Sequence, residues 1–229
     1  MLNYEVDADL LRPYVPAGTE LDTHDGINFV SVVGFLFLNT RVLGVSIPFH
    51  RNFEEVNLRF YVRRRTQDEW RRGVVFIKEI VPRRAIATVA RWLYNENYIA
   101  LPMRHAIHLP SLHTNTAKAE ISWRTQSQWN SLHVEFEGEP VLPEPGSDGE
   151  FITEHYWGYT RQRDGGTKEY RVDHPQWPLW PATHVELGCD VRNVYGSEFV
   201  EPLSAKPASA FVAVGSEITV GPGVRIETD

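Results

Sequence analysis

The sequence predicts a mainly β (α+β) fold: an antiparallel β-barrel, or a closed and strongly curved sheet, with flanking strands and one main helix. Short apolar or alternating segments with the period of a β-strand recur along the chain. Only one long segment has helical periodicity, and turn residues separate most of the others. Many strands with few helices favour a barrel or a curved sheet.

The N-terminal elements are expected to be a short helix and a buried strand. Residues 7–14 fit a helix in which Asp7 acts as the N-cap, and Pro16 lies just beyond its end. Residues 29–38 are apolar on both faces, which is typical of a strand that is buried on both sides.

Residues 53–80 fit a long hairpin. Its strands cover 53–62 and 73–80, and the polar segment 63–72 connects them. The first strand alternates, so that one face is apolar and the other polar. The apolar face carries Val56, Leu58, Phe60 and Val62, and the polar face carries Glu55, Asn57, Arg59 and Tyr61.

The main helix is expected near residues 83–96. Apolar residues recur there at steps of three and four, after a proline that suits the first turn of a helix. They are Ile86, Val89, Ala90, Leu93 and Tyr94, and the proline is Pro82.

The rest of the chain is expected to add strands at 101–109, 117–124, 131–137, 156–163, 167–173, 184–194 and 210–220. Asp164, Gly165 and Gly166 form a hairpin turn that needs positive φ. The loop 139–149 is rich in proline and glycine and cannot continue a ladder. Because the part after this loop has few helical patterns to close its own core, we expect residues 1–229 to form a single domain.

Composition excludes several classes of protein. The chain has 229 residues, of which 42% are hydrophobic, and this is enough to build a core without covalent links. Cys189 is the only cysteine, which excludes a disulfide scaffold. No apolar run has transmembrane length, and the acidic N-terminus lacks the basic start of a signal peptide. We therefore expect a cytoplasmic protein with no membrane partner.

Charge is distributed unevenly around a net value of −7. Residues 59–91 contain ten basic and three acidic residues. Such a patch attracts anions, but the alternative is a set of solvated arginines beside a hairpin connection and a helix start. The negative total argues against a nucleic-acid partner. Glycine-rich phosphate loops and a G-x-S-x-G elbow are both absent.

Several segments, in order along nearly the whole chain, resemble the YqjF-like family, also called DUF2071. They are Tyr4–Gly18, Leu21-Asp22 with Asp25-Gly26, Phe53–Val62, Gly73–Phe76, Ala90–Tyr94, Phe151–Tyr156, and Tyr159–Arg161 ahead of His174-Pro175. The family has no established activity. The resemblance implies a fold like that of acetoacetate decarboxylase: a cone-like antiparallel β-barrel with a pocket inside.

The decarboxylase uses a lysine that forms a Schiff base with a β-keto acid, beside a second lysine that lowers the pKa of the first. Its lysine pair follows an Arg-x-Leu pattern, which is Arg91-Trp92-Leu93 here, and falls on Tyr98-Ile99. Neither residue forms an imine, but the same resemblance makes Tyr98 a candidate residue of the pocket. The chain has four lysines and none lies between 79 and 117: Lys78, Lys118, Lys168 and Lys206. The resemblance therefore implies the fold without the Schiff-base chemistry. Lys78, in the strand before the helix, is an alternative source of an amine, but its neighbour in the sequence is Glu79 and not a second lysine.

Glu55, Asn57 and Arg59 are the most informative candidates for a site. Their spacing places all three on one face of a strand. If that face lines a lumen, a carboxylate, an amide and a guanidinium converge, and the arginine can grip a carboxylate or phosphate. The alternatives are a solvated outer face or a buried Glu–Arg pair that sets strand register. In the related decarboxylase a glutamate from this region reaches the pocket, and Glu54 or Glu55 is the nearest match.

A second candidate is the corner formed by His155, Tyr159 and His174, with Glu154, Tyr156 and Trp177 nearby. A histidine beside glutamate and tyrosine suits acid–base work near neutral pH. The alternative is an aromatic corner whose polar tips bind the backbone. His105, His108 and His113 do not suit a metal site, because a three-residue step on a strand points to opposite faces. We expect no metal and no cofactor.

We expect the protein to bind a small anionic metabolite in a pocket inside the barrel. The expected reaction is of the lyase or isomerase class and does not use a Schiff-base lysine. Glu55 and a histidine or tyrosine would act as acid and base, with Arg59 as anchor. The alternative is a non-catalytic carrier or sensor of a small molecule. An interaction module would use exposed tryptophans such as Trp70, Trp123 and Trp129. Edge strands also leave open a homo-oligomer.

Overall fold

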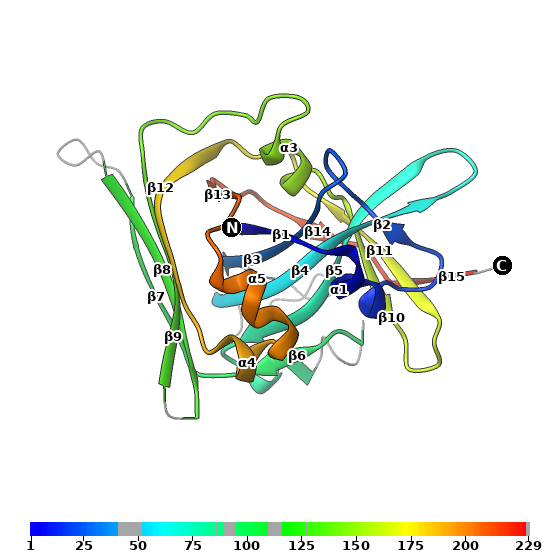
Figure 1. The fold of residues 1–229 in the computed structure, drawn as a ribbon, viewed down its shortest axis with the longest axis horizontal. Helices are drawn as coiled ribbons and strands as arrows, with labels where there is room; N and C mark the ends of the chain where they lie inside the picture. Colours follow the sequence, from blue (N-terminus) through cyan, green and yellow to red (C-terminus); the bar gives the residue numbers. More distant parts are fainter. Residues whose placement is uncertain (41–51, 86, 89–94, 110–115, 127, 228–229) are drawn as a thin grey trace.

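The computed structural model describes residues 1–40, 52–85, 87–88, 95–109, 116–126 and 128–227. Strands dominate these residues and join into one sheet of fifteen strands, with a few short helices around it (Figure 1). The elements of the first half are β1 (Leu2–Val6), α1 (Ala8–Leu11), a 3-10 turn η1 (Arg12–Tyr14), β2 (Glu20–Leu21), β3 (Asn28–Phe37), β4 (Phe53–Arg65), β5 (Trp70–Val81) and β6 (Tyr98–Ala100).

The elements of the second half are β7 (Met103–His108), β8 (Thr116–Thr125), β9 (Gln128–Glu137), α3 (Asp148–Thr153), β10 (Trp157–Arg161), β11 (Thr167–Asp173), β12 (Leu179–Gly188), α4 (Val191–Val194), η2 (Ser197–Phe199), α5 (Val200–Ser204), β13 (Ser209–Ala213), β14 (Thr219–Val220) and β15 (Val224–Ile226). Among the described residues no helix has both the length and the apolar character that crossing a bilayer requires.

The sheet is curved but open. Its strand order is β14-β11-β10-β5-β4-β3-β1-β13-β12-β9-β8-β7, with β15 on β11, β2 on β4 and β6 on β5. No ladder between described residues joins β14 to β7, so the expected barrel is not closed. Most ladders are antiparallel as expected, but β5 pairs in parallel with both β6 and β10.

The main core lies where β3, β4 and β5 face the β8–β9 side of the sheet (Figure 1). The predicted apolar face of β4 packs into it, since Val56, Leu58 and Phe60 are each 0% exposed. Ile121 of β8 and Leu132 of β9 approach Gly34 of β3 from the opposite side. Burial of apolar surface here, at about 25 cal/mol per Å², decides the orientation of β4. The polar face of β4 therefore points away from the main core.

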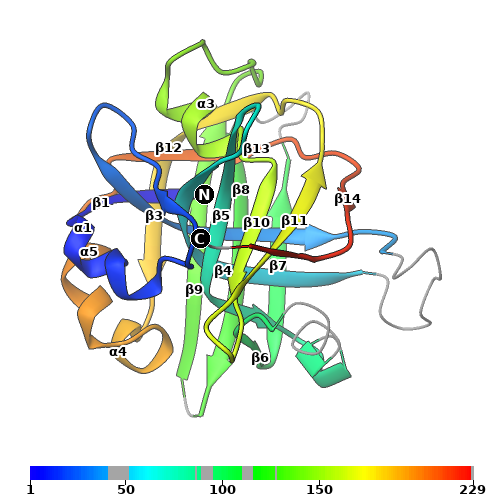
Figure 2. The same ribbon diagram turned by 90° about the vertical axis from the view of Figure 1, so that its right-hand side faces the viewer.

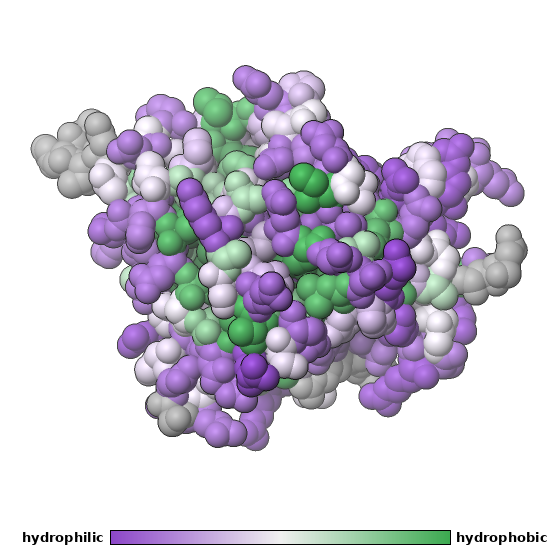
Figure 3. Space-filling model, viewed as in Figure 1, coloured by the Kyte–Doolittle hydropathy of each residue, from purple (hydrophilic) through white to green (hydrophobic). Residues whose placement is uncertain are grey.

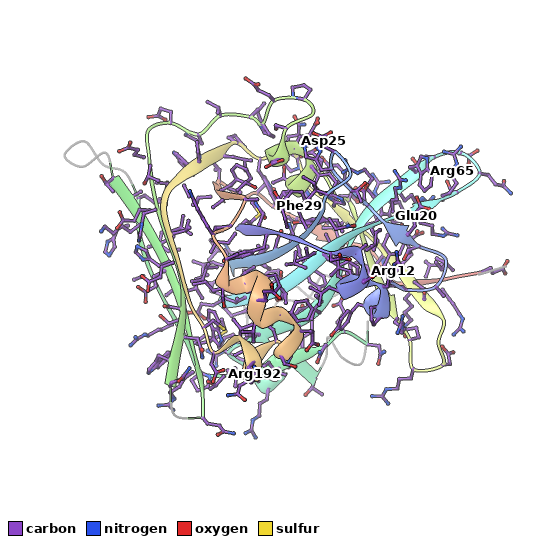
Figure 4. All side chains as sticks on the ribbon, viewed as in Figure 1. Arg12, Glu20, Asp25, Phe29, Arg65 and Arg192 are labelled. Carbon is purple, nitrogen blue, oxygen red and sulfur yellow. The ribbon has the colours of Figure 1, made fainter. Side chains whose placement is uncertain are left out.

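A smaller apolar cluster covers part of that other face. Phe151 and Ile152 of α3 pack against Phe29, Tyr61 and Val74. Figure 4 shows Phe29 on β3 directly below α3. The helix starts at Ser147, whose side chain accepts a hydrogen bond from the Glu150 amide at 3.3 Å. The sequence predicted a loop over 139–149 and no element over 150–153, so this helix of six residues was not predicted.

Most expected strands are confirmed. Asp7 caps α1 by accepting from the Asp9 amide at 2.8 Å. The β10–β11 turn has Gly165 at φ 85°. The expected strand at 184–194 is wrong beyond Gly188, because Asp190 accepts from the Asn193 amide and starts α4. The expected main helix near 83–96 lies largely outside the described residues, which omit 86 and 89–94.

The two tryptophans that are exposed among the described residues, Trp70 and Trp129, each make a cation–π contact with an arginine. The guanidinium carbon of Arg63 lies 4.5 Å from the ring centre of Trp70, and that of Arg104 lies 4.2 Å from that of Trp129. Trp123 is 0% exposed and belongs to the main core. On the face shown in Figure 3, hydrophobic residues alternate with hydrophilic ones. Trp70 and Trp129 therefore have charged neighbours, which disfavours the apolar patch that an interaction module needs.

Gly158 provides a test of the packing between β10 and β11. It lies directly opposite Tyr170, and a Cβ at this position would overlap the Tyr170 ring. We expect Gly158→Ala to lower the free energy of unfolding by about 1–3 kcal/mol, measured by urea unfolding. Gly221→Ala is the matched control, because its Cβ would lie 3.5 Å from the nearest atom, the Arg171 carbonyl oxygen. Equal stability of the two variants would contradict this packing.

Candidate functional site

A one-residue bulge in β5 determines which side chains reach the polar face of β4. Arg59 of β4 pairs with Phe76 of β5, but the next residue, Leu58, pairs with Lys78. Ile77 is therefore the extra residue. Without it, Lys78 would lie opposite Asn57, because a one-residue shift of register exchanges the two faces of a strand. The bulge instead places Glu79 opposite Asn57.

The segment 95–100 continues this row of polar residues. Tyr98 of β6 pairs with Glu79 in the parallel β5–β6 ladder, so Asn57, Glu79 and Tyr98 lie side by side on three strands. The Asn97 side chain donates to the carbonyl of Ile77, the bulge residue, at 2.9 Å. The Glu79 amide donates to the Asn97 carbonyl at 3.1 Å. These bonds fix Glu96 and Tyr98 beside Glu79.

Glu55, Glu79 and Glu96 form a buried group that we call the carboxyl cluster. Their exposed fractions are 2%, 0% and 8%. Glu55 accepts from the Asn57 amide nitrogen at 3.1 Å and from the Tyr98 hydroxyl at 3.3 Å.

Strands β10 and β11, which lie beside β5 in Figure 2, close the cluster on its far side. The Tyr170 hydroxyl donates to Glu96, and the Thr160 hydroxyl donates to the same oxygen at 3.4 Å.

Burial changes the protonation of all three carboxyls. Burial, together with the charge of Glu96, raises the pKa of Glu55 from 4.5 to about 8, against the opposing effects of Asn57, Tyr98 and Arg59. Burial raises the pKa of Glu96 to about 7 despite the bonds from Tyr170 and Thr160. Burial and the two neighbouring carboxyls raise the pKa of Glu79 well above its ordinary value. The cluster therefore holds and exchanges protons near neutral pH, as general acids and bases must.

Arg59 lies on the same face of β4, two residues from Asn57. Its Nη2 donates to the Ile152 carbonyl of α3 at 3.2 Å, and its guanidinium carbon lies 5.6 Å from the centre of the Tyr61 ring. Its charge partly lowers the pKa of Glu55. Arg59 is therefore next to the carboxyl cluster but is not bonded to it.

The lysines differ in their relation to the cluster. Lys78 points to the main-core side, where Nζ donates to the Val194 carbonyl of α4 at 2.6 Å and burial lowers its pKa. Lys118 pairs with Glu135 on the outer face of β8 and β9. Lys168 lies opposite Thr160 in the β10–β11 ladder, on the side of the sheet where Thr160 meets Glu96.

His155, the second expected group, lies in a separate buried pair. Its Nε2 is 3.1 Å from Asp22 Oδ2, which also accepts from Arg72 Nε at 2.6 Å. Burial lowers the pKa of His155 to about 4, so the imidazole is neutral and donates to Asp22. Burial acts to raise the pKa of Asp22, but the bonds from His155 and Arg72 outweigh it and lower the pKa. This arrangement stabilises the ion pair between Asp22 and Arg72.

Tyr159 and His174 do not join either group. Tyr159 is 1% exposed in the main core, and its hydroxyl donates to the Arg71 carbonyl at 3.3 Å. His174 is half-buried, and its ring centre lies 4.1 Å from that of Trp177 and 4.7 Å from that of Tyr156.

Among the hollows at the surface of the described residues, two lie away from the carboxyl cluster. One, of about 590 Å³, is lined by Tyr156, Arg171, Asp173, His174, Pro175, Glu217 and Thr219. The other, of about 520 Å³, lies at the turn of the β4–β5 hairpin, where Figure 4 labels Arg65. No group of three metal-ligating side chains with metal-site geometry occurs in the described part of the chain.

The sequence analysis therefore brought together Glu55, Asn57 and Tyr98 but missed Glu79 and Glu96. Glu79 is a lone acid in the apolar segment 73–81, which was a usable signal. The sequence does not reveal the bulge, and in a regular hairpin the Glu79 side chain would point to the opposite face of the sheet from Asn57. Glu96 lies in a short polar segment after the expected helix, where no periodicity applies.

Comparisons with known proteins agree with the expected resemblance. A family model for DUF2071, described as an uncharacterized conserved protein, matches residues 1–217. The uncharacterized protein YqjF of Bacillus subtilis (strain 168) is 29% identical over 195 residues, which are 84% of this chain and 75% of that protein.

Solved structures show the same fold. Acetoacetate decarboxylase from Legionella pneumophila has a TM-score of 0.61 at 13% identity, over 99% of this chain and 83% of that one. The enduracididine biosynthesis enzyme MppR complexed with pyruvate has a TM-score of 0.59 at 11% identity, over 97% of this chain and 80% of that one. At these identities the likeness concerns the fold alone. The expected acetoacetate decarboxylase-like fold is confirmed.

The raised pKa values predict how stability depends on pH. Between about pH 5 and pH 8 the folded protein keeps protons on Glu55 and Glu96 that the unfolded chain, with ordinary values of 4.5, releases. The free energy of unfolding should therefore fall as pH rises through this range. Glu55→Gln removes this titration and should raise stability at about pH 8 by about 1–3 kcal/mol.

Urea unfolding at several pH values measures this effect. Glu137→Gln, which changes an exposed carboxyl at the end of β9, is the control and should leave the pH dependence as it is. A Glu55→Gln variant with the same pH dependence as the unchanged protein would contradict the proton-holding cluster.

Proposed function

Because the chain belongs to the DUF2071 family and has an acetoacetate decarboxylase-like fold, we propose that it binds a small carboxylic acid with a carbonyl group beside the carboxyl cluster. We further propose that the cluster moves protons on this molecule. The observation that carries the proposal is Glu55, which is buried, raised in pKa to about 8 and bonded to Asn57 and Tyr98.

The proposed reaction is a proton transfer next to a carbonyl group. Glu55 in its ionised form takes a proton from the carbon, and the electron pair of the C–H bond moves onto the carbonyl oxygen. Once Glu55 carries the proton, the Tyr98 hydroxyl, which donates to the Glu55 carboxylate in the free protein, donates its hydrogen bond to the enolate oxygen instead. A protonated neighbour, Glu79 or Glu96, returns a proton to carbon or oxygen. These proton transfers need no oxidant or reductant, and together they amount to an isomerisation. Lyase chemistry would require, in addition, that the enolate expel a leaving group from the neighbouring carbon.

Arg59 is the proposed anchor for the carboxylate of the ligand. Its guanidinium lies on the same face of β4 as Glu55 and Asn57, and a guanidinium fork matches a carboxylate. The electrostatic effect of Arg59 on Glu55 supports this placement, since it requires the two groups to be near each other.

Exchange of carbon-bound hydrogen with deuterium tests the proposal. Pyruvate is a suitable first probe, because a protein of the same fold is known in complex with it. In D2O, nuclear magnetic resonance should show faster loss of the pyruvate methyl proton signal with protein than without. Glu55→Gln should slow this exchange by about 100-fold or more, and Glu137→Gln should leave it unchanged.

Two results would count against this function. Equal exchange with Glu55→Gln and with the unchanged protein would remove Glu55 from the reaction. Binding of pyruvate without any exchange would favour the alternative, a carrier or sensor of small carboxylic acids.

Borohydride reduction tests the absence of a Schiff base. Lys78 is directed to α4, and Tyr98 stands where the resemblance places the first lysine. We expect no covalent adduct by intact mass spectrometry after reduction with pyruvate or acetoacetate. An adduct mapped by peptide mass spectrometry to Lys78, or to Lys168 on the Thr160 side of β11, would show that an amine takes part.

A further inference from the structure

Four buried polar atoms at the polar face of β4 have no hydrogen-bond partner among the described residues. Three are acceptors, namely Glu79 Oε1, Glu79 Oε2 and Asn57 Oδ1, and one is a donor, Arg59 Nε. Glu79 is 0% exposed and Asn57 is 1% exposed. Buried polar atoms in folded proteins nearly always find partners, so a group of unpartnered ones points to a missing molecule.

The three acceptors share one place on the sheet. Asn57 and Glu79 are directly opposite each other in the β4–β5 ladder, which brings their side chains within about 5 Å. The Asn57 amide nitrogen is already used on Glu55. The side-chain carbonyl oxygen of Asn57 therefore remains as an acceptor. Once Glu79 gives up its proton, a change that the nearby Tyr98 hydroxyl favours, both Glu79 oxygens are acceptors for the same donor.

A matching ligand group must supply several N–H donors. A carboxylate or a ketone supplies none, whereas an ammonium supplies three and an amidinium up to four. Positive charge is favoured as well, because three carboxyl groups surround the place. The unpartnered donor Arg59 Nε has the opposite requirement and suits an anion.

We propose that the ligand carries an ammonium or amidinium group that donates to Glu79 and Asn57, in addition to the carboxylate that meets Arg59. This inference rests on the proposed function and narrows its substrate class to small carboxylic acids with a basic nitrogen. Asn57 and Arg59 are two residues apart, about 7 Å along the strand. A short chain therefore separates the two charged groups of the ligand.

The charged and titratable groups that face this place predict the sign of the pH dependence. They are Glu55 and Arg59 of β4, Glu79 of β5, Glu96 and Tyr98 of the segment 95–100, and Tyr170 of β11, with the Met1 amine and His155 near Arg59. The carboxyls hold protons in the free protein. A bound cation replaces these protons. Cation binding therefore releases protons, and the affinity for the cation increases as pH rises. A ligand with only a carboxylate takes up protons and binds more weakly as pH rises.

Three probes of equal length separate these cases. 4-Aminobutyrate has both charges, pentanoate replaces its ammonium with a methyl group, and butylammonium replaces its carboxylate with a methyl group. Isothermal titration calorimetry in two buffers with different ionisation enthalpies gives affinity and proton release together. We expect 4-aminobutyrate to bind roughly tenfold or more tightly than pentanoate at pH 7. We also expect it to release protons and to bind more tightly at pH 8 than at pH 6.

Glu79→Gln tests the assignment at one residue. The substitution replaces an acceptor oxygen with an amide NH2 group. It should weaken the binding of 4-aminobutyrate roughly tenfold or more and change the affinity for pentanoate little. Glu137→Gln, the control, should change the affinity for neither ligand. If Glu79→Gln does not fold, the proton release of the unchanged protein decides the matter.

The failure of this inference can be told apart from the failure of the proposed function. Tightest binding by pentanoate, with proton uptake, would overturn the cation assignment, and so would no binding by any of the three. Deuterium exchange on pyruvate that depends on Glu55 would in either case leave the proposed function standing.

Discussion

The site depends on one extra residue in β5. Ile77 interrupts the β4–β5 ladder and moves every later side chain of β5 to the other face. Lys78 is thereby sent to the main-core side, where it reaches α4, and Glu79 is sent to the polar face beside Asn57. The same bulge exposes the Ile77 carbonyl to the Asn97 side chain, and this bond holds Glu96 and Tyr98 against Glu79. One local irregularity therefore makes an acidic site out of a hairpin that would otherwise present a lysine there.

Such a site is unfavourable for stability, and the surrounding structure offsets the cost. Three carboxyl groups in a small buried volume cannot all be ionised, because burial and mutual repulsion both favour the protonated forms. The large apolar core on the other face of β4 stabilises the sheet independently of them. Proton binding then reduces the charge of the cluster at neutral pH. Groups with pKa values near 7 and 8 are also those best suited to proton transfer at that pH.

The sequence predicted the fold class and the division of β4 into an apolar and a polar face, but it left open which face points inward, and it named only part of the carboxyl cluster. Strict alternation from Glu55 to Val62 made the two faces distinguishable, since one face had to join the core. A bulge leaves no such mark, because its extra residue, Ile77, is one of several apolar residues in a row. Short helices such as α4 were equally hidden, since one turn shows no 3.6-residue period. His155 shows a different limit: its neighbours suggested acid–base work, but burial keeps it neutral beside Asp22.

Tyr98 connects the fold resemblance with the chemistry. The resemblance places a lysine pair at Tyr98-Ile99, and amines at that position would balance the charge of nearby carboxyls. A phenol brings no such charge, and the pKa of Tyr98 is itself raised further by burial and by the cluster. The cluster must then be neutralised in another way, either by protons or by a cation from outside the protein. A tyrosine in place of a lysine at this position therefore affects more than one reaction, because the buried carboxyls must then be balanced by protons or by the cation proposed above.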